Sequence, residues 1–286
     1  MERKYLKGAD GLTLAADVAG EPGAQPVVLL HGGGQTRHSW GALTRTLASN
    51  GYYAMTVDMR GHGESEWAVD GNYGLDRFVA DEEAILADLD QAPVLIGASL
   101  GGMSSLLAAA GLGEDRVKGL VLVDIVPRVE PEGVQRIRQF MLAHIDGFDS
   151  YDEVVEAVNA YMPHRPRAPK SDGLRKNLRV GEDERLYWHW DPAFIRSDRT
   201  PSSASNIERM RDAARSVRVP SLLVRGKLSD VVSDEGVEDF LELIPGSRAV
   251  DVSDAGHMVS GDQNDVFNDA ILAFLAELRQ TDTRGA

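Results

Sequence analysis

The sequence predicts an α/β fold, in which a mostly parallel central sheet is flanked by helices and interrupted by one helical insert. Short apolar runs alternate with segments of helical periodicity along most of the 286 residues, which is typical of parallel strands joined by helical crossovers. The run at 93–96 leads directly into Gly97-Ala98-Ser99-Leu100-Gly101. No apolar strand run occurs between 128 and 215, so we place the insert there.

Composition narrows the classes of protein to consider. The chain has 43% hydrophobic and 26% charged residues, as expected for a soluble globular protein. It has no cysteine, which excludes disulfides, thiolate nucleophiles and thiolate metal sites. A net charge of −15 argues against nucleic acid or an anionic membrane surface as partner. We find no signal-peptide pattern or membrane-spanning run, so we expect a cytoplasmic monomer or homodimer.

The first half of the chain is expected to build most of the sheet. Asp10-Gly11 is a strong hairpin signal between 2–8 and 12–18. Continuous apolar runs indicate strands buried on both faces. In chain order the patterns predict a strand at 27–30, a helix at 39–50, a strand at 53–58, a helix at 75–90, the strand that ends at 98 and its helix, and a strand at 119–124.

The second half begins with the insert, which we interpret as a lid over the carboxyl edge of the sheet. Two capping boxes, Ser150 with Glu153 and Ser205 with Glu208, start helices in it. The alternation then resumes, with strands at 220–226 and 248–252 and helices at 234–243 and 267–278. The predicted division is 1–127 for the first part of the core, 128–215 for the helical cap and 216–286 for the second part of the core.

Ser99 is the candidate nucleophile. A strand, a sharp turn and a helix around Gly-x-Ser-x-Gly predict a nucleophile elbow, which holds the serine hydroxyl above the carboxyl edge of the sheet. Gly97 and Gly101 lack the Cβ atoms that would clash in so tight a turn. The start of the helix beneath the serine favours negative charge there.

A serine nucleophile needs a base, and the base needs an orienting carboxylate. His257, just after the last predicted strand, is the candidate base. Asp230 is our first choice of acid, because it lies in the loop after the buried strand at 220–226 and fits the chain order Ser…Asp…His that is typical of such elbows. Asp124, at the end of the strand at 119–124, is the alternative acid.

Two backbone amides are expected to form the oxyanion hole. The N–H of Leu100, the residue after the nucleophile, is one donor. The other should come from His31-Gly32-Gly33-Gly34 after the strand at 27–30, where we choose Gly33 and leave Gly34 open. Loss of one such donor typically costs about 3 kcal/mol of transition-state stabilisation.

The remaining assignments concern the pocket and bound groups. Candidates for an apolar substrate pocket are Trp40, Trp188, Trp190 and Met258, although core residues would give the same pattern. No paired-histidine metal motif and no phosphate-cradling glycine motif is present. We therefore expect no metal and no cofactor.

Together these motifs resemble the α/β-hydrolase superfamily. The resemblance is carried by Leu29-Leu30-His31-Gly32, Asp58-x-Arg60-Gly61-His62-Gly63-x-Ser65, Gly97-x-Ser99-x-Gly101-Gly102, Gly226-x-x-x-Asp230 and Gly256-His257. It implies a triad of Ser99, Asp230 and His257, with Arg60 and His62 mainly structural. The chain looks most like lidded bacterial serine carboxylesterases, and a serine replaces the aspartate nucleophile of epoxide hydrolases and haloalkane dehalogenases.

The resulting hypothesis is a serine hydrolase that cleaves a small ester through an acyl-enzyme. The same triad could hydrolyse a C–C bond or a lactone. A hydrolase-fold protein that senses a ligand with little turnover is a third possibility. The sequence does not separate C–C from lactone hydrolysis, whereas an intact triad disfavours the ligand-sensing alternative.

Overall fold

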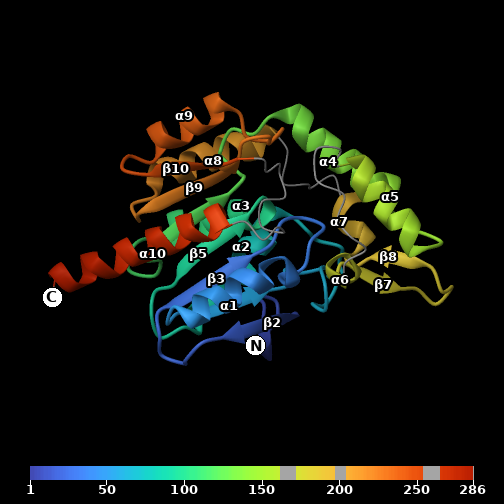
Figure 1. Ribbon diagram of the computed structural model, residues 1–286, viewed down its shortest axis with the longest axis horizontal. Helices are drawn as coiled ribbons and strands as arrows, with labels where there is room; N and C mark the ends of the chain where they lie inside the picture. The colour runs from blue at the N-terminus through green and yellow to red at the C-terminus, as the bar shows by residue number, and fades with distance from the viewer. Residues whose placement is uncertain (162–171, 197–203, 254–264, 286) are drawn as a thin grey trace.

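The predicted α/β architecture is confirmed by the computed structural model, which describes residues 1–161, 172–196, 204–253 and 265–285. Its main sheet has the strand order β1-β2-β4-β3-β5-β6-β9-β10 (Figure 1). The strands are β1 (Glu2–Lys7), β2 (Thr13–Ala19), β3 (Pro26–Leu30), β4 (Tyr53–Val57), β5 (Val94–Ala98), β6 (Gly119–Val123), β9 (Ser221–Gly226) and β10 (Arg248–Val252). Only β2 pairs antiparallel, with β1 on one side and β4 on the other. From β4 to β10 every pairing is parallel.

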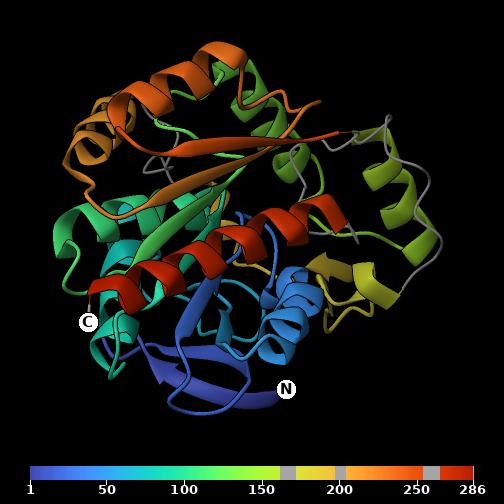
Figure 2. The same cartoon turned by 60° about the vertical axis from the view of Figure 1, so that its left-hand side comes forward.

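Helices cover both faces of this sheet. One face carries α1 (Gly41–Ser49) and α10 (Asp265–Gly285), and the other carries α2 (Leu75–Ala87), α3 (Leu100–Leu112), α8 (Ala204–Ser216) and α9 (Asp234–Leu243) (Figure 2). A one-turn 3-10 helix, η1 (Arg37–Trp40), precedes α1. The side chains of β3 alternate between the two cores, Val27 and Leu29 into one and Val28 and Leu30 into the other. Burial on both faces explains why this strand is apolar at every position.

Between β6 and β9 the chain forms the cap. Its described elements are α4 (Pro131–Ala143), α5 (Tyr151–Tyr161), α6 (Asp172–Arg175), β7 (Leu178–Val180), β8 (Leu186–Trp188) and α7 (Pro192–Arg196). The antiparallel pair β7–β8 was not expected, because strands of three residues are too short to show a period. Ser150 caps α5 as predicted, since its Oγ accepts the Glu153 N–H at 3.2 Å. The side chain of Ser205 lies outside the described set.

The last helix of the predicted insert, α8, packs against α3 and α9 on the core rather than among the cap helices. The amphipathic pattern of this helix predicts that one face is buried, but it does not identify the element against which that face packs. The domain boundaries at 127/128 and 215/216 stay a prediction.

The cap is joined to the core by hydrogen bonds as well as by its connections. The Gly63 N–H donates to the His189 carbonyl at 2.6 Å, and the Asp191 N–H donates to the Gly61 carbonyl at 2.8 Å. The Tyr73 hydroxyl donates to the Asp191 carboxylate at 2.5 Å. Residues 189–191 are therefore held against the loop that follows β4.

None of the described helices is long and apolar enough to cross a membrane.

A buried acid lies between α2 and α3, away from the end of β5. Glu82 is 1% exposed and accepts hydrogen bonds from the hydroxyls of Ser104 (2.5 Å) and Ser105 (2.7 Å). Burial raises the pKa of Glu82 from 4.5 to about 7, against the opposing effect of the two hydroxyls. The folded state therefore binds a proton that the unfolded state releases between these two pH values, and stability falls as pH rises through that window.

Glu82→Gln removes this titration, so the variant should become more stable relative to the parent protein by about 3 kcal/mol between pH 5 and pH 8. Urea unfolding of both proteins at the two pH values measures the difference. Histidines and other acids titrate in both proteins, so their contributions cancel in the difference in stability between the two. A difference that is the same at both pH values would show that Glu82 titrates normally.

Candidate active site

Ser99 connects β5 to α3 in a conformation that few side chains adopt. Its φ is 47° and its ψ is −112°, in the left-handed half of backbone space where a non-glycine residue is strained. Its N–H extends the sheet by donating to the Val123 carbonyl at 3.2 Å, and its own carbonyl accepts from the Met103 N–H at 2.9 Å. The predicted strand–turn–helix is thus present, with the serine hydroxyl at the start of α3.

Two glycines make this turn possible. A Cβ on Gly97 would lie 2.4 Å from the Gly101 carbonyl oxygen, and one on Gly101 would lie 2.4 Å from the Leu30 carbonyl oxygen. Both contacts are with backbone, which cannot move aside without separating α3 from β3 and β5. The glycine spacing is therefore required by packing.

The loop after β3 lies next to the serine and is fixed by two buried histidines. The Nδ1 of His31 bonds the Gly32 carbonyl and its Nε2 accepts from the Met59 N–H at 3.0 Å. The Nδ1 of His62 bonds the Arg60 carbonyl at 2.9 Å, and its Nε2 accepts from the Gly34 N–H at 3.1 Å. Because each Nε2 is an acceptor, both rings are neutral.

Burial enforces that neutrality. It lowers the pKa of His31 to about 4, and burial together with the neighbouring His31 lowers that of His62 to about 3. Arg60 is equally engaged, with two 2.6 Å bonds to Asp81. These are the contacts of structural residues, in agreement with the role that the motifs implied for Arg60 and His62.

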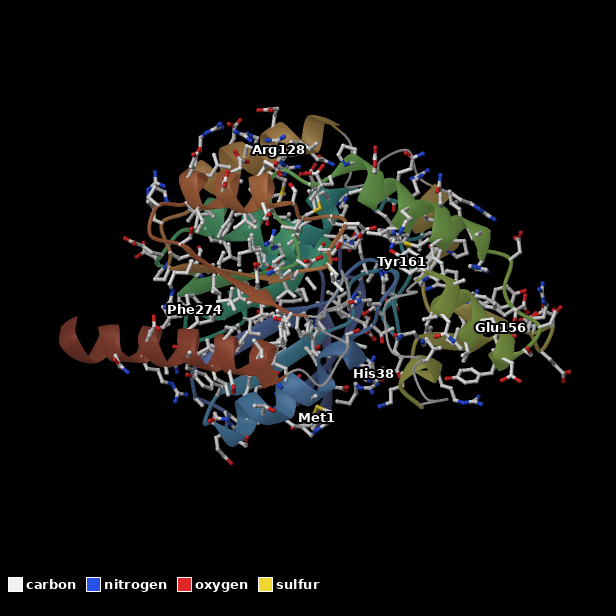
Figure 3. The ribbon with its side chains drawn as sticks, turned by 45° about the horizontal axis from the view of Figure 1, so that its top comes forward. Met1, His38, Arg128, Glu156, Tyr161 and Phe274 are labelled. Atoms are coloured by element: carbon white, nitrogen blue, oxygen red, sulfur yellow. The ribbon has the colours of Figure 1, made fainter. Side chains whose placement is uncertain are left out.

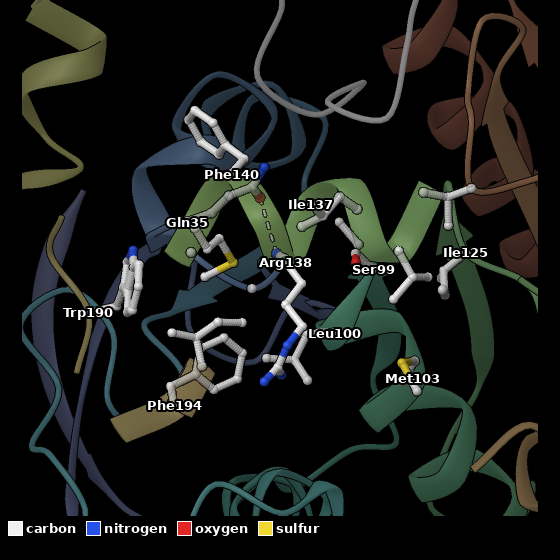
Figure 4. A pocket seen from close by; sticks show the side chains of 18 of the residues that line it. Gln35, Ser99, Leu100, Met103, Ile125, Ile137, Arg138, Phe140, Trp190 and Phe194 are labelled. Atoms are coloured by element: carbon white, nitrogen blue, oxygen red, sulfur yellow. Dashed lines mark hydrogen bonds between the residues drawn. The ribbon is translucent and has the colours of Figure 1, made fainter. Parts of the chain in front are cut away.

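The hydrogen bonds of the same loop distinguish Gly33 from Gly34 as the second oxyanion donor. The Gly34 amide is bonded to His62, and the Gly32 amide donates to the Gln35 side chain at 3.1 Å (Figure 4). Within the described residues the Gly33 N–H has no such acceptor. The Leu100 N–H is likewise available, because the first residue of a helix has no preceding turn to accept it. The geometry thus favours Gly33 over Gly34.

Asp124 lies beside the serine at the same edge of the sheet. Ala98 and Val123 are register partners, so the next residues, Ser99 and Asp124, leave their strands side by side. Asp124 is fully buried and has a φ of 49°. Its carboxylate accepts the Gly226 N–H at 3.0 Å and the Ser229 hydroxyl at 2.6 Å. Neutral donors therefore hold a buried carboxylate in one orientation.

Asp230 is placed differently. Its side chain is 31% exposed, and its Oδ2 lies 3.2 Å from the Nε of Arg136 on α4. Its charge also contributes, after burial, to raising the pKa of Tyr161 to about 12. The carboxylate preferred from chain order thus faces the cap helices, and the alternative acid is the one adjacent to Ser99.

The predicted base His257 and the pocket candidate Met258 lie outside the described residues. Their roles stay predictions.

A cavity of about 370 Å³ lies over Ser99, between the core and the cap. Its core side includes Gly33, Ser99 and Leu100, and its cap side is mostly apolar (Figure 4). The described cap side chains that line it include Ile137, Phe140, Met141, Val158, Trp188, Trp190, Phe194 and Ile195. Tyr161 of α5 also lines it, whereas Glu156 is on the exposed side of that helix (Figure 3). This arrangement matches the predicted lid over the carboxyl edge.

The tryptophans named from the sequence divide between two environments. Trp188 and Trp190 line the cavity. Trp40 does not: it is fully buried in the core on the α1 and α10 face and stacks with Phe267 at 6.3 Å between ring centres. The expectation that Trp40 forms the pocket is replaced by a packing role, because η1 and α1 turn it towards that core.

Two residues of the site had no role in the sequence prediction. Ser229 is one residue before the predicted acid, but only the fold brings its hydroxyl to Asp124. Arg138 of α4 lines the cavity, and its signal in the sequence is weak because α4 carries a second arginine, Arg136, two positions earlier. No cluster of three histidine, aspartate or glutamate side chains suited to a metal occurs within the described ranges.

Comparisons with known proteins agree with this geometry. The chain is 29% identical over 247 residues to esterase Rv0045c of Mycobacterium tuberculosis, covering 84% of this chain and 79% of the relative. It is 27% identical to a 3-hydroxybutyrate-oligomer hydrolase of Cupriavidus necator, covering 83% and 84%. An α/β hydrolase from Novosphingobium aromaticivorans superposes with a TM-score of 0.81 at 26% identity, covering 96% and 98%.

The sequence profile of the alpha/beta hydrolase fold matches residues 25–219, which include the elbow and the cap. These residues are more than half of the chain. The protein belongs to the α/β-hydrolase family.

Proposed function

We propose that the protein is a serine esterase that hydrolyses a small carboxylic ester through an acyl-enzyme. The observation that carries the proposal is Ser99 in its strained turn, at the start of α3 and at the wall of a mostly apolar cavity. A serine held in this way is exposed to a ligand on one side and to backbone donors on the other. The esterases and hydrolases among the relatives support the same reaction class.

The chemistry follows from the groups around the serine. Ser99 Oγ attacks the ester carbonyl, and the imidazole of His257 takes its proton and returns it to the leaving alcohol. The negative charge on the carbonyl oxygen is stabilised by the amides of Gly33 and Leu100. Water, activated by the same imidazole, then attacks the acyl-enzyme and restores the serine.

For the acid we propose Asp124 in preference to Asp230. A triad acid has to stabilise an imidazolium without being protonated itself, which needs a fixed and desolvated carboxylate. Asp124 is buried and oriented by Gly226 and Ser229, whereas Asp230 is partly exposed and is already neutralised by Arg136. In the sequence, His257 follows closely after β10. We therefore test both carboxylates as the acid, as described below.

Ser99→Ala should lower kcat/KM for p-nitrophenyl butyrate by about 10⁴- to 10⁶-fold, because the nucleophile is lost while the cavity remains. Initial rates of the two proteins measure this, and thermal unfolding provides the control for an intact fold. A fluorophosphonate should label the parent protein at Ser99 and leave the variant unlabelled. Full turnover by the variant would refute the mechanism.

The same assay separates the remaining alternatives. Preference for a lactone or a 1,3-diketone over the open-chain ester would keep the triad and change the bond that is cleaved. Ligand binding that is equal in the parent protein and Ser99→Ala, without turnover by either, would indicate a sensing protein instead.

Asp124→Asn should reduce kcat by about 10³- to 10⁴-fold with little change in KM, because the neutral amide cannot stabilise an imidazolium. Asp230→Asn should cost less than about tenfold. Steady-state kinetics on matched preparations give the comparison, with thermal unfolding to show that each variant is folded. The reverse order of the two losses would return the role to Asp230.

A further inference from the structure

Arg138 has an environment unlike that of the other cavity residues. It is half-buried on α4 and lines the cavity together with Leu100 and Phe194 (Figure 4). Within the described residues no carboxylate lies within ion-pair distance of its guanidinium and no side chain accepts a hydrogen bond from it. Two positions earlier on the same helix, Arg136 does have such a partner, Asp230 at 3.2 Å.

The charge balance of the cavity is also unusual for this protein. The chain has 45 acidic and 30 basic residues, so an average surface of it is negative. Yet no aspartate or glutamate is among the described residues that line the cavity. Most of the lining is apolar, and the half-buried guanidinium of Arg138 is partly removed from water without a carboxylate beside it among the described residues. That cost is recovered when a ligand supplies the anion.

We propose that Arg138 is a specificity-determining residue that binds a carboxylate on the substrate, so that the preferred substrates are small esters bearing one ionised carboxylate. The proposal rests on the esterase function above and names the substrate class of that same site. The planar guanidinium offers two parallel N–H donors that match the two oxygens of a carboxylate. One guanidinium neutralises one carboxylate, whereas a phosphate monoester would bring additional negative charge into an apolar space.

The volume of the cavity guides the choice of substrate. Arg138 and Ser99 line the same space of about 370 Å³, which is at the lower end of ligand pockets. We therefore propose substrates in which a short chain separates the carboxylate from the scissile ester. The carboxylate can be on the acyl side, as in a half-ester of a dicarboxylic acid, or on the alcohol side, as in an ester of a hydroxy acid.

Matched pairs of esters test the proposal on the parent protein. For the acyl side the pair is monoethyl glutarate and its amide, ethyl glutaramate. For the alcohol side it is 3-butyryloxybutyrate and 3-butyryloxybutanamide. Each pair has nearly the same shape and differs in charge. We expect at least one carboxylate ester to have a kcat/KM about 10- to 100-fold above that of its amide, from a charge-assisted hydrogen bond.

The dependence on Arg138 is tested with three variants. Arg138→Gln should abolish the preference for the carboxylate, mainly through a rise in KM for the carboxylate ester. Arg138→Lys should retain part of the preference, because it keeps the charge but not the planar fork. Arg196→Gln removes an exposed arginine from the same cap and serves as the matched control, with the parent preference intact.

The outcomes distinguish this inference from the esterase proposal. Equal rates on ester and amide in both pairs, or equal losses on both in Arg138→Gln, would overturn the role of Arg138 while hydrolysis itself stands. Absence of Ser99-dependent hydrolysis of any ester would refute the esterase proposal. Calorimetric binding to Ser99→Ala of whichever carboxylate ester is preferred, weakened about tenfold or more in Ser99→Ala/Arg138→Gln, supports the role of Arg138 without turnover; equal binding of that ester by the two proteins overturns it.

Discussion

The close approach of α3 to β3 and β5 is the constraint on which the site depends. It exists only because Gly97 and Gly101 present no side chains where helix and strand backbones meet. The approach forces Ser99 into its unusual backbone conformation and directs the first amides of α3 towards the carboxyl edge of the sheet. One packing condition thus positions the proposed nucleophile and one proposed oxyanion donor together. The sheet beneath them is covered by α10 on one face and by α2 and α8 on the other.

Buried polar contacts extend this arrangement to the surrounding loops. His31 and His62 are neutral acceptors, and each uses its Nε2 to fix a backbone amide of a neighbouring loop. In doing so, His62 engages the Gly34 amide and leaves that of Gly33 to the cavity. Asp124 is oriented from β9 by Gly226 and Ser229. Residues at the ends of three strands therefore hold the site in place. We expect none of them to contact the carbonyl group of the substrate.

Most of the fold could be predicted because its signals are local. Apolar runs identified the central strands of the main sheet, the Asp10-Gly11 turn identified the hairpin of β1 and β2, and the turn after β5 identified Ser99. What could not be predicted depends on contacts between distant segments. Whether Asp124 or Asp230 faces the serine is decided by how β6 and β9 pair and by the ion pair of Asp230 with α4. Trp40 and Trp190 are equally apolar in sequence, and only the direction of their segments separates core from cavity.

The hydrogen bonds between residues 189–191 and the loop after β4 fix one short segment of the cap to the core. They give the insert a third point of attachment, in addition to the two places where it leaves and rejoins the core sequence. Helices such as α4 and α5 can then change length or composition while this short segment keeps its register. A foreign cap grafted onto this core would need a counterpart of Asp191 to keep this attachment, because the Tyr73 hydroxyl of the core donates its hydrogen bond to that carboxylate.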